Sequence, residues 1–388
     1  MNEQLYIEAK QEIAMKQNGI RPDVQALMCQ ATLLSLQANG QSIQSIQLVE
    51  QGEIEKELWS CDLESPKNMI YKILGAKFLE EKLSKYEDPL QYIRLRLAEE
   101  AIKTAAKEVG HNLLFSPCIG TVLSLDCNAV TLRVPGLERP LILFSLGILD
   151  FYESLVRCCV HLLKWNLNAN DISYEIDTDY ALNKLKNDAK ITRSFQEALN
   201  NVFIAQMTSV VNEHLQPEVH MLGVDSALRG VIWHFIMGHE YGHLIHGDLN
   251  EEEADWMQEY KADARGFELM CNSTWQSVAP NSMQKEEVPI DFYHKIIGLS
   301  VFFSGIGIIE KASEFIFGDK GQQEKSTHPP AVERWQYLAA AIYKGSEDKE
   351  LSLKTFKYAN DMSNILWMLL SHSGEALREL RNKLSMSE

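Results

Sequence analysis

The sequence predicts an α+β fold that is mostly helical, with a small antiparallel sheet or hairpin next to a central pair of helices. Apolar residues recur at three- and four-residue spacing along most of the chain, whereas the stretch 121–134 is rich in β-branched residues. The composition, with 45% hydrophobic and 23% charged side chains in 388 residues, excludes a largely disordered chain. A chain of this length can bury a core without disulfide bonds.

The net charge and the cysteine content indicate which partners the protein can bind and in which cellular compartment it resides. The chain has 37 Lys and Arg against 54 Asp and Glu, a formal net charge of −17, and such a surface repels phosphate backbones. Its seven cysteines are odd in number and form no CxxC motif, as expected of reduced thiols. The N-terminal residues mix charges and lack the apolar core of a signal peptide. We therefore expect a cytoplasmic protein that has no nucleic-acid partner.

The first part of the chain is predicted to be a helical region followed by strands. Helical periodicity is clear over 68–81 and 91–108, and an Asp-Pro pair separates the two segments. The pattern then changes, because 121–125 (TVLSL) and 129–134 (AVTLRV) are rich in β-branched residues and the residues between them suit a turn. These two segments are predicted to pair as a β-hairpin.

The remainder of the chain is predicted to be mostly helical. A long helix is expected over 146–165. The longest apolar run, 296–309 (IIGLSVFFSGIGII), is shorter than a standard membrane span and contains Ser and Gly. We expect this run to form a buried helix and the chain to have no membrane span.

The motif HEYGH carries the strongest chemical pattern. Asp225 can cap a helix that contains the motif and ends at a glycine. His239 and His243 are four residues apart, so they project from one face of that helix and can bind one Zn²⁺. Glu240 is placed to take a proton from water at such a metal and to pass it to a leaving amine. The alternative is a structural pair of helix histidines with an ion-paired glutamate.

A Zn²⁺ site of this kind needs a third protein ligand and leaves its fourth position to water. A second helix is expected to begin at three consecutive glutamates, which suit the positive end of a helix dipole. Glu259 and Asp263 share one face of this helix, so Glu259 can be the third ligand while Asp263 accepts an N–H from a ligand histidine. Two antiparallel helices would return Glu259, rather than the earlier carboxylates, to the level of the histidines. A solvated acidic helix face is the alternative.

Large side chains are expected to hold the second helix onto the first. Spacings of three, four and seven residues put Trp256, Tyr260 and Phe267 near one stripe of the second helix, and Met257 follows Trp256 in the sequence. The sequence therefore predicts that they pack against the first helix. The alternative is that the aromatic residues form a substrate pocket.

The motifs together resemble those of gluzincin metallopeptidases. HEYGH and EYKAD (259–263) are similar to the HExxH and ExxAD motifs of the HtpX and CAAX-prenyl-protease lineage, and THPPAVER (327–334) is similar to its THP motif with a following Arg. The resemblance covers 225–334 and implies a zincin-type active-site helix pair. It also implies that His328 and Arg334 lie near the active site, where they either stabilise the tetrahedral oxyanion or orient the groups around the metal.

Two features differ from the membrane-bound members of that lineage. The chain has no obvious transmembrane helices, and only fifteen residues separate His243 from Glu259. The lack of a membrane domain and the HExxH helix that ends in Gly resemble the soluble Lit-like phage-exclusion peptidases. ImmA/IrrE-like peptidases share HExxH followed closely by E-x-x-A, but they do not carry the THPP-Arg segment.

The sequence-based hypothesis is a zinc-dependent endopeptidase, a hydrolase that acts on a protein or peptide substrate. We assign 111–340 to the metallopeptidase domain, 1–110 to an N-terminal helical region and 341–388 to a C-terminal helical segment. Since the flanking regions carry no chemical motif, the alternative is a partner-gated regulatory or phage-defence protein whose peptidase site is latent until an activating partner engages it. A purely structural zinc site is disfavoured, because such sites close with four Cys or His ligands and only Cys271 is near.

Overall fold

The computed structural model describes most of the chain and divides it into two compact units. The described residues are 2–17, parts of 21–30, 84–87, 89–111, 113, 116–122, 129–168, 171–204, 215–247, 256–273, 290–318 and 328–385. Unit 1 comprises 1–100, 113–124 and 128–146, and unit 2 comprises 101–112, 125–127 and 147–388. The helix expected over 68–81 lies outside the described residues, and the assignment of three functional regions stays a prediction.

Unit 1 contains a three-stranded sheet in the order β1-β3-β2. β1 (Cys118–Val122) pairs in parallel with β3 (Leu141–Ser145), and β2 (Ala129–Leu132) pairs antiparallel with the other edge of β3. The predicted hairpin is therefore wrong, because β3 lies between the two segments that were expected to pair. β3 (LILFS) is buried along its whole length, and such a central strand lacks the alternation that marks a strand in a sequence.

The first helix is tied to the sheet of unit 1. α1 (Glu3–Gln17) packs against β1, and Ile7 joins Leu141 and Leu143 in a buried apolar cluster. The buried carboxylate of Glu87 accepts hydrogen bonds from the backbone N–H of Thr121 (3.0 Å), from its Oγ1 (2.6 Å) and from Nε2 of Gln11 (3.0 Å). A polar network of this kind fixes α1 relative to β1 because every buried partner is satisfied. α5 (Pro89–Glu108) begins in unit 1 and ends in unit 2.

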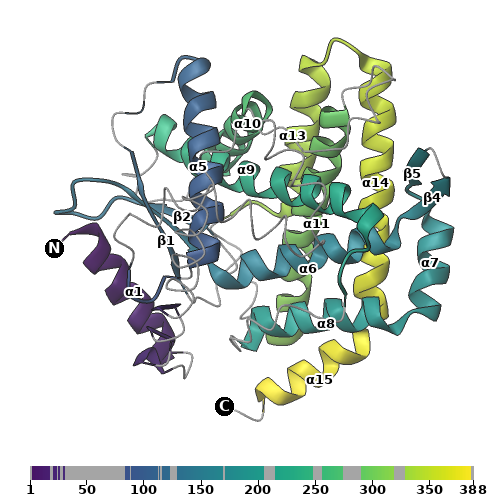
Figure 1. The fold of residues 1–388 in the computed structure, drawn as a ribbon, viewed down its shortest axis with the longest axis horizontal. Helices are drawn as coiled ribbons and strands as arrows, with labels where there is room; N and C mark the ends of the chain where they lie inside the picture. Colours follow the sequence, from purple (N-terminus) through teal and green to yellow (C-terminus); the bar gives the residue numbers. More distant parts are fainter. Residues whose placement is uncertain are drawn as a thin grey trace, which may run out of the picture. The chain divides into compact units, whose positions relative to one another are not determined.

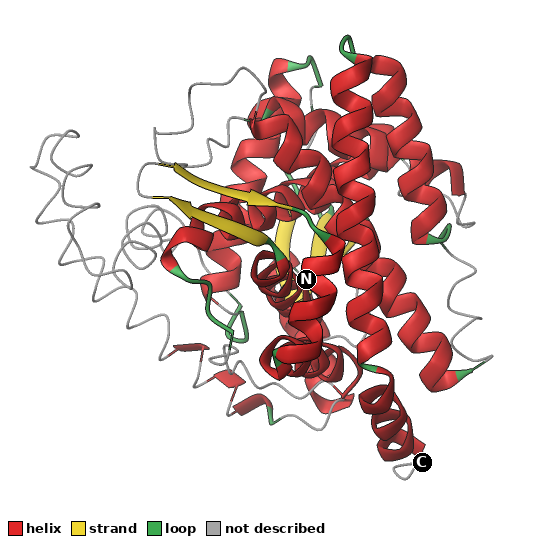
Figure 2. Cartoon of the chain, turned by 90° about the vertical axis from the view of Figure 1, so that its right-hand side faces the viewer, coloured by secondary structure: helices red, strands yellow, loops and turns green. Residues whose placement is uncertain are grey.

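In the described residues of unit 2, the regular secondary structure is helical apart from one antiparallel β-hairpin (Figures 1 and 2). The hairpin, formed by β4 (Lys164–Asn168) and β5 (Asp171–Glu175), was not predicted, because its segments KWNLN and DISYE are largely polar. The mostly helical α+β class is confirmed. The helices that lie wholly or almost wholly in this unit are α6 (Leu146–Leu162), α7 (Thr178–Asn187), α8 (Ala189–Ile204), the short η1 (Val219–Met221), α9 (Leu222–His246), α10 (Trp256–Asn272), α11 (Ile290–Phe317), α13 (Ala331–Gly345), α14 (Lys349–His372) and α15 (Gly374–Ser385).

α11 is the core helix of unit 2. It packs against α9, α13, α14 and α15, and the predicted buried run 296–309 lies within it, with Leu299 and Val301 fully buried. The prediction of a buried helix is confirmed. Within the described residues, Phe292–Phe317 is also long and apolar enough to cross a membrane. However, 72% of the most apolar 18-residue stretch of this segment is buried inside the protein. Core helices meet the same criterion, and the lack of a membrane span stays a prediction.

Candidate metal centre

α9 carries the two motif histidines and is buried along most of its length. It ends at Gly247, whose φ of 75° is the left-handed conformation that terminates helices at glycine. The expected cap is wrong: α9 begins at Leu222, so Asp225 lies inside its first turn. There Asp225 is fully buried and forms an ion pair with Arg229, one turn later in the same helix. This pairing offsets part of the cost of burying the carboxylate, whose Oδ2 faces Arg229 while Oδ1 has no hydrogen-bond partner among the described residues.

Glycines allow α9 and α10 to approach each other closely. A Cβ atom on Gly238 would lie 2.9 Å from the carbonyl oxygen of Gly266, and one on Gly242 would lie 2.9 Å from Cα of Ala262. A Cβ on Gly266 would lie 2.8 Å from the backbone nitrogen of His239. Because the numbers rise along α9 as they fall along α10, the two helices are antiparallel. This contact brings the first turns of α10 to the level of the motif histidines.

The predicted packing of large side chains between the two helices is wrong for Trp256 and Met257. Trp256 and Met257 are 43% and 44% exposed, and Phe267 is only partly buried. Tyr260 stacks on Tyr337 of α13, with ring centroids 4.6 Å apart. The physical reason is the glycine contact, since backbones this close leave no room for aromatic side chains between them. The alternative, that these aromatics form a substrate pocket, stays a prediction.

Three donor side chains, which we call the donor cluster, converge where α9 meets α10: His239, His243 and Glu259. The two histidine Nε2 atoms lie 3.2 Å apart. Oε2 of Glu259 lies 3.5 Å from Nε2 of His239, and Oε1 lies 3.6 Å from Nε2 of His243. Ligands of a tetrahedral zinc ion with bonds of about 2.0–2.1 Å would be about 3.3 Å apart. The donor cluster therefore has the spacing and the ligand types that one zinc ion requires.

Asp263 and Arg334 support the donor cluster from behind. Oδ1 of Asp263 lies 2.9 Å from Nδ1 of His239, so the carboxylate holds the proton on Nδ1 and leaves the Nε2 lone pair for a metal. Arg334 of α13 donates to the same carboxylate from Nε (2.8 Å) and Nη2 (2.6 Å), and its Nη1 lies 3.3 Å from Oε2 of Glu259. One buried guanidinium thus fixes the carboxylates of both Asp263 and Glu259.

The charges of this network keep both carboxyl groups ionised. Burial raises the pKa of Asp263, but the charge of Arg334 and the hydrogen bonds from Arg334 and His239 outweigh it and lower that pKa. Burial likewise acts to raise the pKa of Glu259, whereas the hydrogen bond to His328 and the charges of His239 and Arg334 bring it well below its usual range. An ionised Glu259 is the form that can ligate a metal.

His328 lies at the exposed edge of the donor cluster. Its Nδ1 is 3.1 Å from Oε1 of Glu259, and its side chain is 45% exposed. Two residues later, Pro330 is the N-cap residue of α13, which begins at Ala331. The structure therefore brings both residues implied by the motif resemblance, His328 and Arg334, against Glu259. Their chemical roles, like those of the cluster itself, remain predictions.

Glu240 is buried beside this network, and its negative charge acts on Arg334. Aromatic rings that were not predicted from the sequence also contact this network. The guanidinium of Arg334 lies 5.8 Å from the ring centroid of Phe303, and Phe235 lies between the Phe303 ring (5.6 Å) and the His239 ring (6.4 Å). Phe303 belongs to the long apolar run of α11, and no local signal in that run distinguishes the ring that faces the site.

Comparisons of the chain with protein-family models, with curated proteins and with solved structures found no match. The resemblance to gluzincin metallopeptidases therefore remains a prediction based on the three motifs. The geometry of the donor cluster and the chemistry of the residues around it are the observations that bear on the function.

Replacing Asp263 with Asn is expected to weaken zinc binding about 10- to 100-fold, the usual effect of losing a partner that orients a ligand histidine. Asn lacks the negative charge that holds the proton on Nδ1 of His239. It also removes one of the two carboxylates that balance the positive charge of the buried Arg334. Competition with a chromophoric chelator measures the change. Glu268→Gln is the matched control, because Glu268 lies on the same helix and pairs with Arg265 instead. Equal zinc affinity in the Asp263 variant and the control would contradict the orienting role.

His234 is a core histidine whose titration is expected to affect stability. Burial lowers its pKa to about 4, although Nδ1 lies 2.7 Å from the carbonyl oxygen of Gly230. An unfolded histidine titrates near pH 6.5, so between pH 6.5 and pH 4 the unfolded state binds more protons and stability falls as the pH falls. The loss is on the order of 3 kcal/mol. Urea unfolding with a chelator present should show a steeper fall in stability toward pH 4 in wild type than in His234→Asn; an equal slope in both would contradict the role of His234.

Proposed function

We propose that the protein is a zinc-dependent endopeptidase that hydrolyses peptide bonds in a protein or peptide substrate. The observation that carries this proposal is the donor cluster, whose nitrogen and oxygen atoms lie 3.2–3.6 Å apart. Within the described residues the donor cluster consists of two histidines and one carboxylate, and three protein ligands leave one position for water or substrate. A structural zinc site would instead be expected to have four protein ligands.

Each residue of the site has a definite part in this chemistry. A zinc ion held by the donor cluster would lower the pKa of a water molecule and polarise the scissile carbonyl. Glu240, next to His239 in the sequence, takes a proton from the attacking water and gives it to the departing amine. Asp263 holds the tautomer of His239, and Arg334 holds Asp263 and Glu259 in position.

His328 is the residue best placed to meet the developing oxyanion. It lies beside the carboxylate of Glu259, and it is partly exposed, whereas Arg334 is buried and already bound to two carboxylates. A donor at the open side of the site can stabilise negative charge that forms only in the transition state. We therefore assign the oxyanion role to His328 and the orienting role to Arg334.

The proposal is tested with Glu240→Gln, which keeps the shape of the side chain but cannot take a proton. We expect the purified, zinc-loaded wild type to cleave members of a broad peptide library, and the variant to keep its zinc but lose at least about 100-fold in rate, because a general base contributes about 10²–10⁴-fold. Mass spectrometry of the library and metal analysis measure the two quantities. Undiminished cleavage by the variant would contradict the role of Glu240. Turnover without any added partner would contradict the partner-gated alternative.

A further inference from the structure

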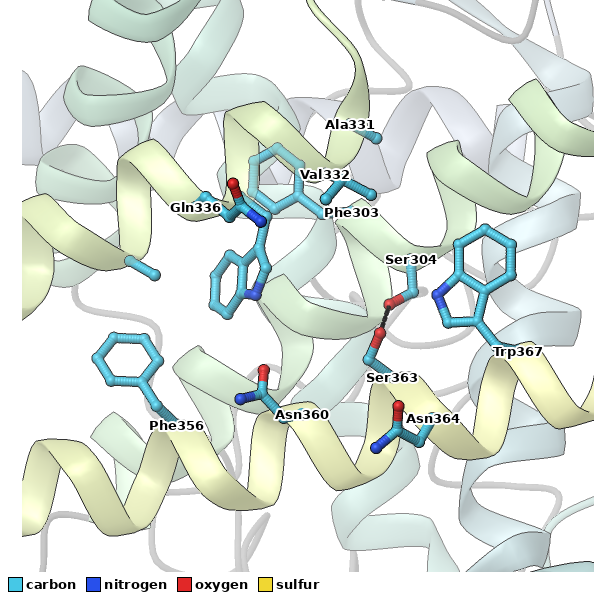
Figure 3. Close-up of a pocket in the computed structure, with 12 residues that line it drawn as sticks. Phe303, Ser304, Ala331, Val332, Gln336, Phe356, Asn360, Ser363, Asn364 and Trp367 are labelled. Atoms are coloured by element: carbon cyan, nitrogen blue, oxygen red, sulfur yellow. Dashed lines mark hydrogen bonds between the residues drawn. The ribbon is translucent and has the colours of Figure 1, made fainter.

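A groove lies between α13 and α14, with α11 as its floor (Figure 3). Its volume is about 490 Å³, which is within the range of sites that hold small ligands or peptide segments. The groove uses the face of α13 that carries Trp335 and Gln336, whereas Arg334 of the same helix binds Asp263 and Glu259. It is therefore a different cavity from the donor cluster, although one helix lines both.

The lining of the groove combines aromatic rings with neutral polar groups. Asn360 and Asn364 rise from α14 into the opening, and Gln336 lies across from them on α13 (Figure 3). All three are exposed, and their carboxamides make no hydrogen bond within the described part of the chain. The described residues that line the groove include no charged side chain, in a protein of net charge −17. A neutral ligand with both donors and acceptors fits such a lining.

The spacing of the carboxamides matches an extended peptide. Asn360 and Asn364 are four residues apart on a helix, a rise of about 6 Å. Alternate residues of an extended chain are about 6.6 Å apart, so each carboxamide can donate to a backbone carbonyl and accept from a backbone N–H of every second residue. Phe356 and Trp367 bracket this pair along α14, about 16 Å apart along the axis, which is the length of about five extended residues (Figure 3).

The floor of the groove suits apolar side chains of such a peptide. Ser304 of α11 donates to Oγ of Ser363 at 2.8 Å, so both hydroxyls are engaged with each other. The neighbouring Phe303 is buried, and its ring lies 5.7 Å from that of Trp335. Engaged hydroxyls and rings leave the floor largely apolar. Within the described residues, the unpaired polar groups of the groove include the carboxamides at the rim and the indole N–H donors of Trp335 and Trp367.

We propose that this groove binds an extended, uncharged peptide segment of about five residues, with its backbone on Asn360 and Asn364. The proposal goes beyond peptide hydrolysis and does not depend on it, because binding here requires neither the donor cluster nor Glu240. If the protein is a peptidase, the groove would hold a part of the substrate remote from the cleaved bond. Since Arg334 contacts the ring of Phe303, an occupied groove adjoins the residues that orient the metal ligands.

The test uses the full-length protein with a chelator, so that no cleavage can occur. The probe is a library of end-capped, fluorescein-labelled pentapeptides without Asp, Glu, Lys or Arg, and binding is read by fluorescence polarisation. We expect members to bind, and their Kd to rise about 30-fold in the double variant Asn360→Ala, Asn364→Ala and about fivefold in Gln336→Ala, because each lost pair of hydrogen bonds is worth about 1 kcal/mol. Lys357→Ala, exposed on the same helix outside the lining, is the control that should bind as wild type does.

A second measurement distinguishes a bound backbone from bound side chains alone. N-methylation of alternate backbone amides in a binding peptide should weaken it as much as the double variant does. No binding by any pentapeptide, binding that is insensitive to both asparagines, or binding that is insensitive to N-methylation would each overturn the proposal. Competition by a neutral oligosaccharide such as maltohexaose, dependent on the same asparagines and in the absence of peptide binding, would assign the groove to a sugar and also overturn it. Circular dichroism checks that the variants are folded.

Discussion

Glu259→Ala is expected to lose zinc on dialysis under conditions in which wild type retains about one ion per chain. The carboxylate of Glu259 supplies both oxygens that face the two histidine Nε2 atoms, at 3.5 and 3.6 Å. Without it, two imidazoles remain, and two ligands do not complete a zinc site. The affinity should fall by more than the 10- to 100-fold expected for Asp263→Asn. Metal analysis after dialysis measures the result.

Glu268→Ala is the matched control for this experiment, because Glu268 lies on the same helix and its carboxylate pairs with Arg265 rather than with the donor cluster. The control should keep its zinc. Equal zinc content in Glu259→Ala and wild type would refute the assignment of Glu259 as the third ligand. This experiment therefore distinguishes two roles of Glu259 that the sequence alone allows: a metal ligand, or one residue of a solvated acidic helix face.

Gly266→Ala is expected to separate α9 from α10 and to weaken both folding and zinc binding. The new Cβ would lie 2.8 Å from the backbone nitrogen of His239, and a backbone cannot move away as a flexible side chain can. Overpacking of this kind costs about 1–3 kcal/mol, which exceeds the gain of up to about 1 kcal/mol from replacing a helical glycine with alanine. Urea unfolding and zinc competition measure the two losses.

Gly223→Ala controls for helix propensity, because Gly223 lies in α9 with no atom near the position of an added Cβ. That variant should be as stable as wild type or slightly more stable, with unchanged zinc affinity. If Gly266→Ala behaved in the same way, the close helix contact would not be what positions Glu259 beside the histidines.

The local parts of the site could be predicted from the sequence. His239 and His243 share a face because of their four-residue spacing, and Gly247 ends the helix because glycine adopts a left-handed conformation without strain. Asp263 could be placed behind His239 because antiparallel helices return the chain by a predictable distance. In each case helical geometry over a few turns determines where the side chain lies.

The parts that depend on tertiary contacts could not be predicted. The contact between α9 and α10 is made by glycines and not by the large side chains that were predicted there. A pattern of apolar residues in a sequence does not show how close the backbones of two helices come. β3 was missed because a short, fully apolar segment has the same appearance in a helix as in a central strand. Phe303 and Phe235 support the site from the interior, and the folded arrangement of α9, α11 and α13 alone brings them to Arg334 and His239.

X-ray absorption at the zinc edge of the dialysed protein tests most directly whether His239, His243 and Glu259 hold a single zinc ion in an open site. We expect one zinc per chain with only nitrogen and oxygen neighbours at about 2.0–2.2 Å, including the multiple-scattering signature of two imidazoles. That signature should fall to one imidazole or vanish with the metal in His243→Ala. A zinc–sulfur distance of about 2.3 Å, four imidazoles, or no bound zinc in the wild type would contradict the account.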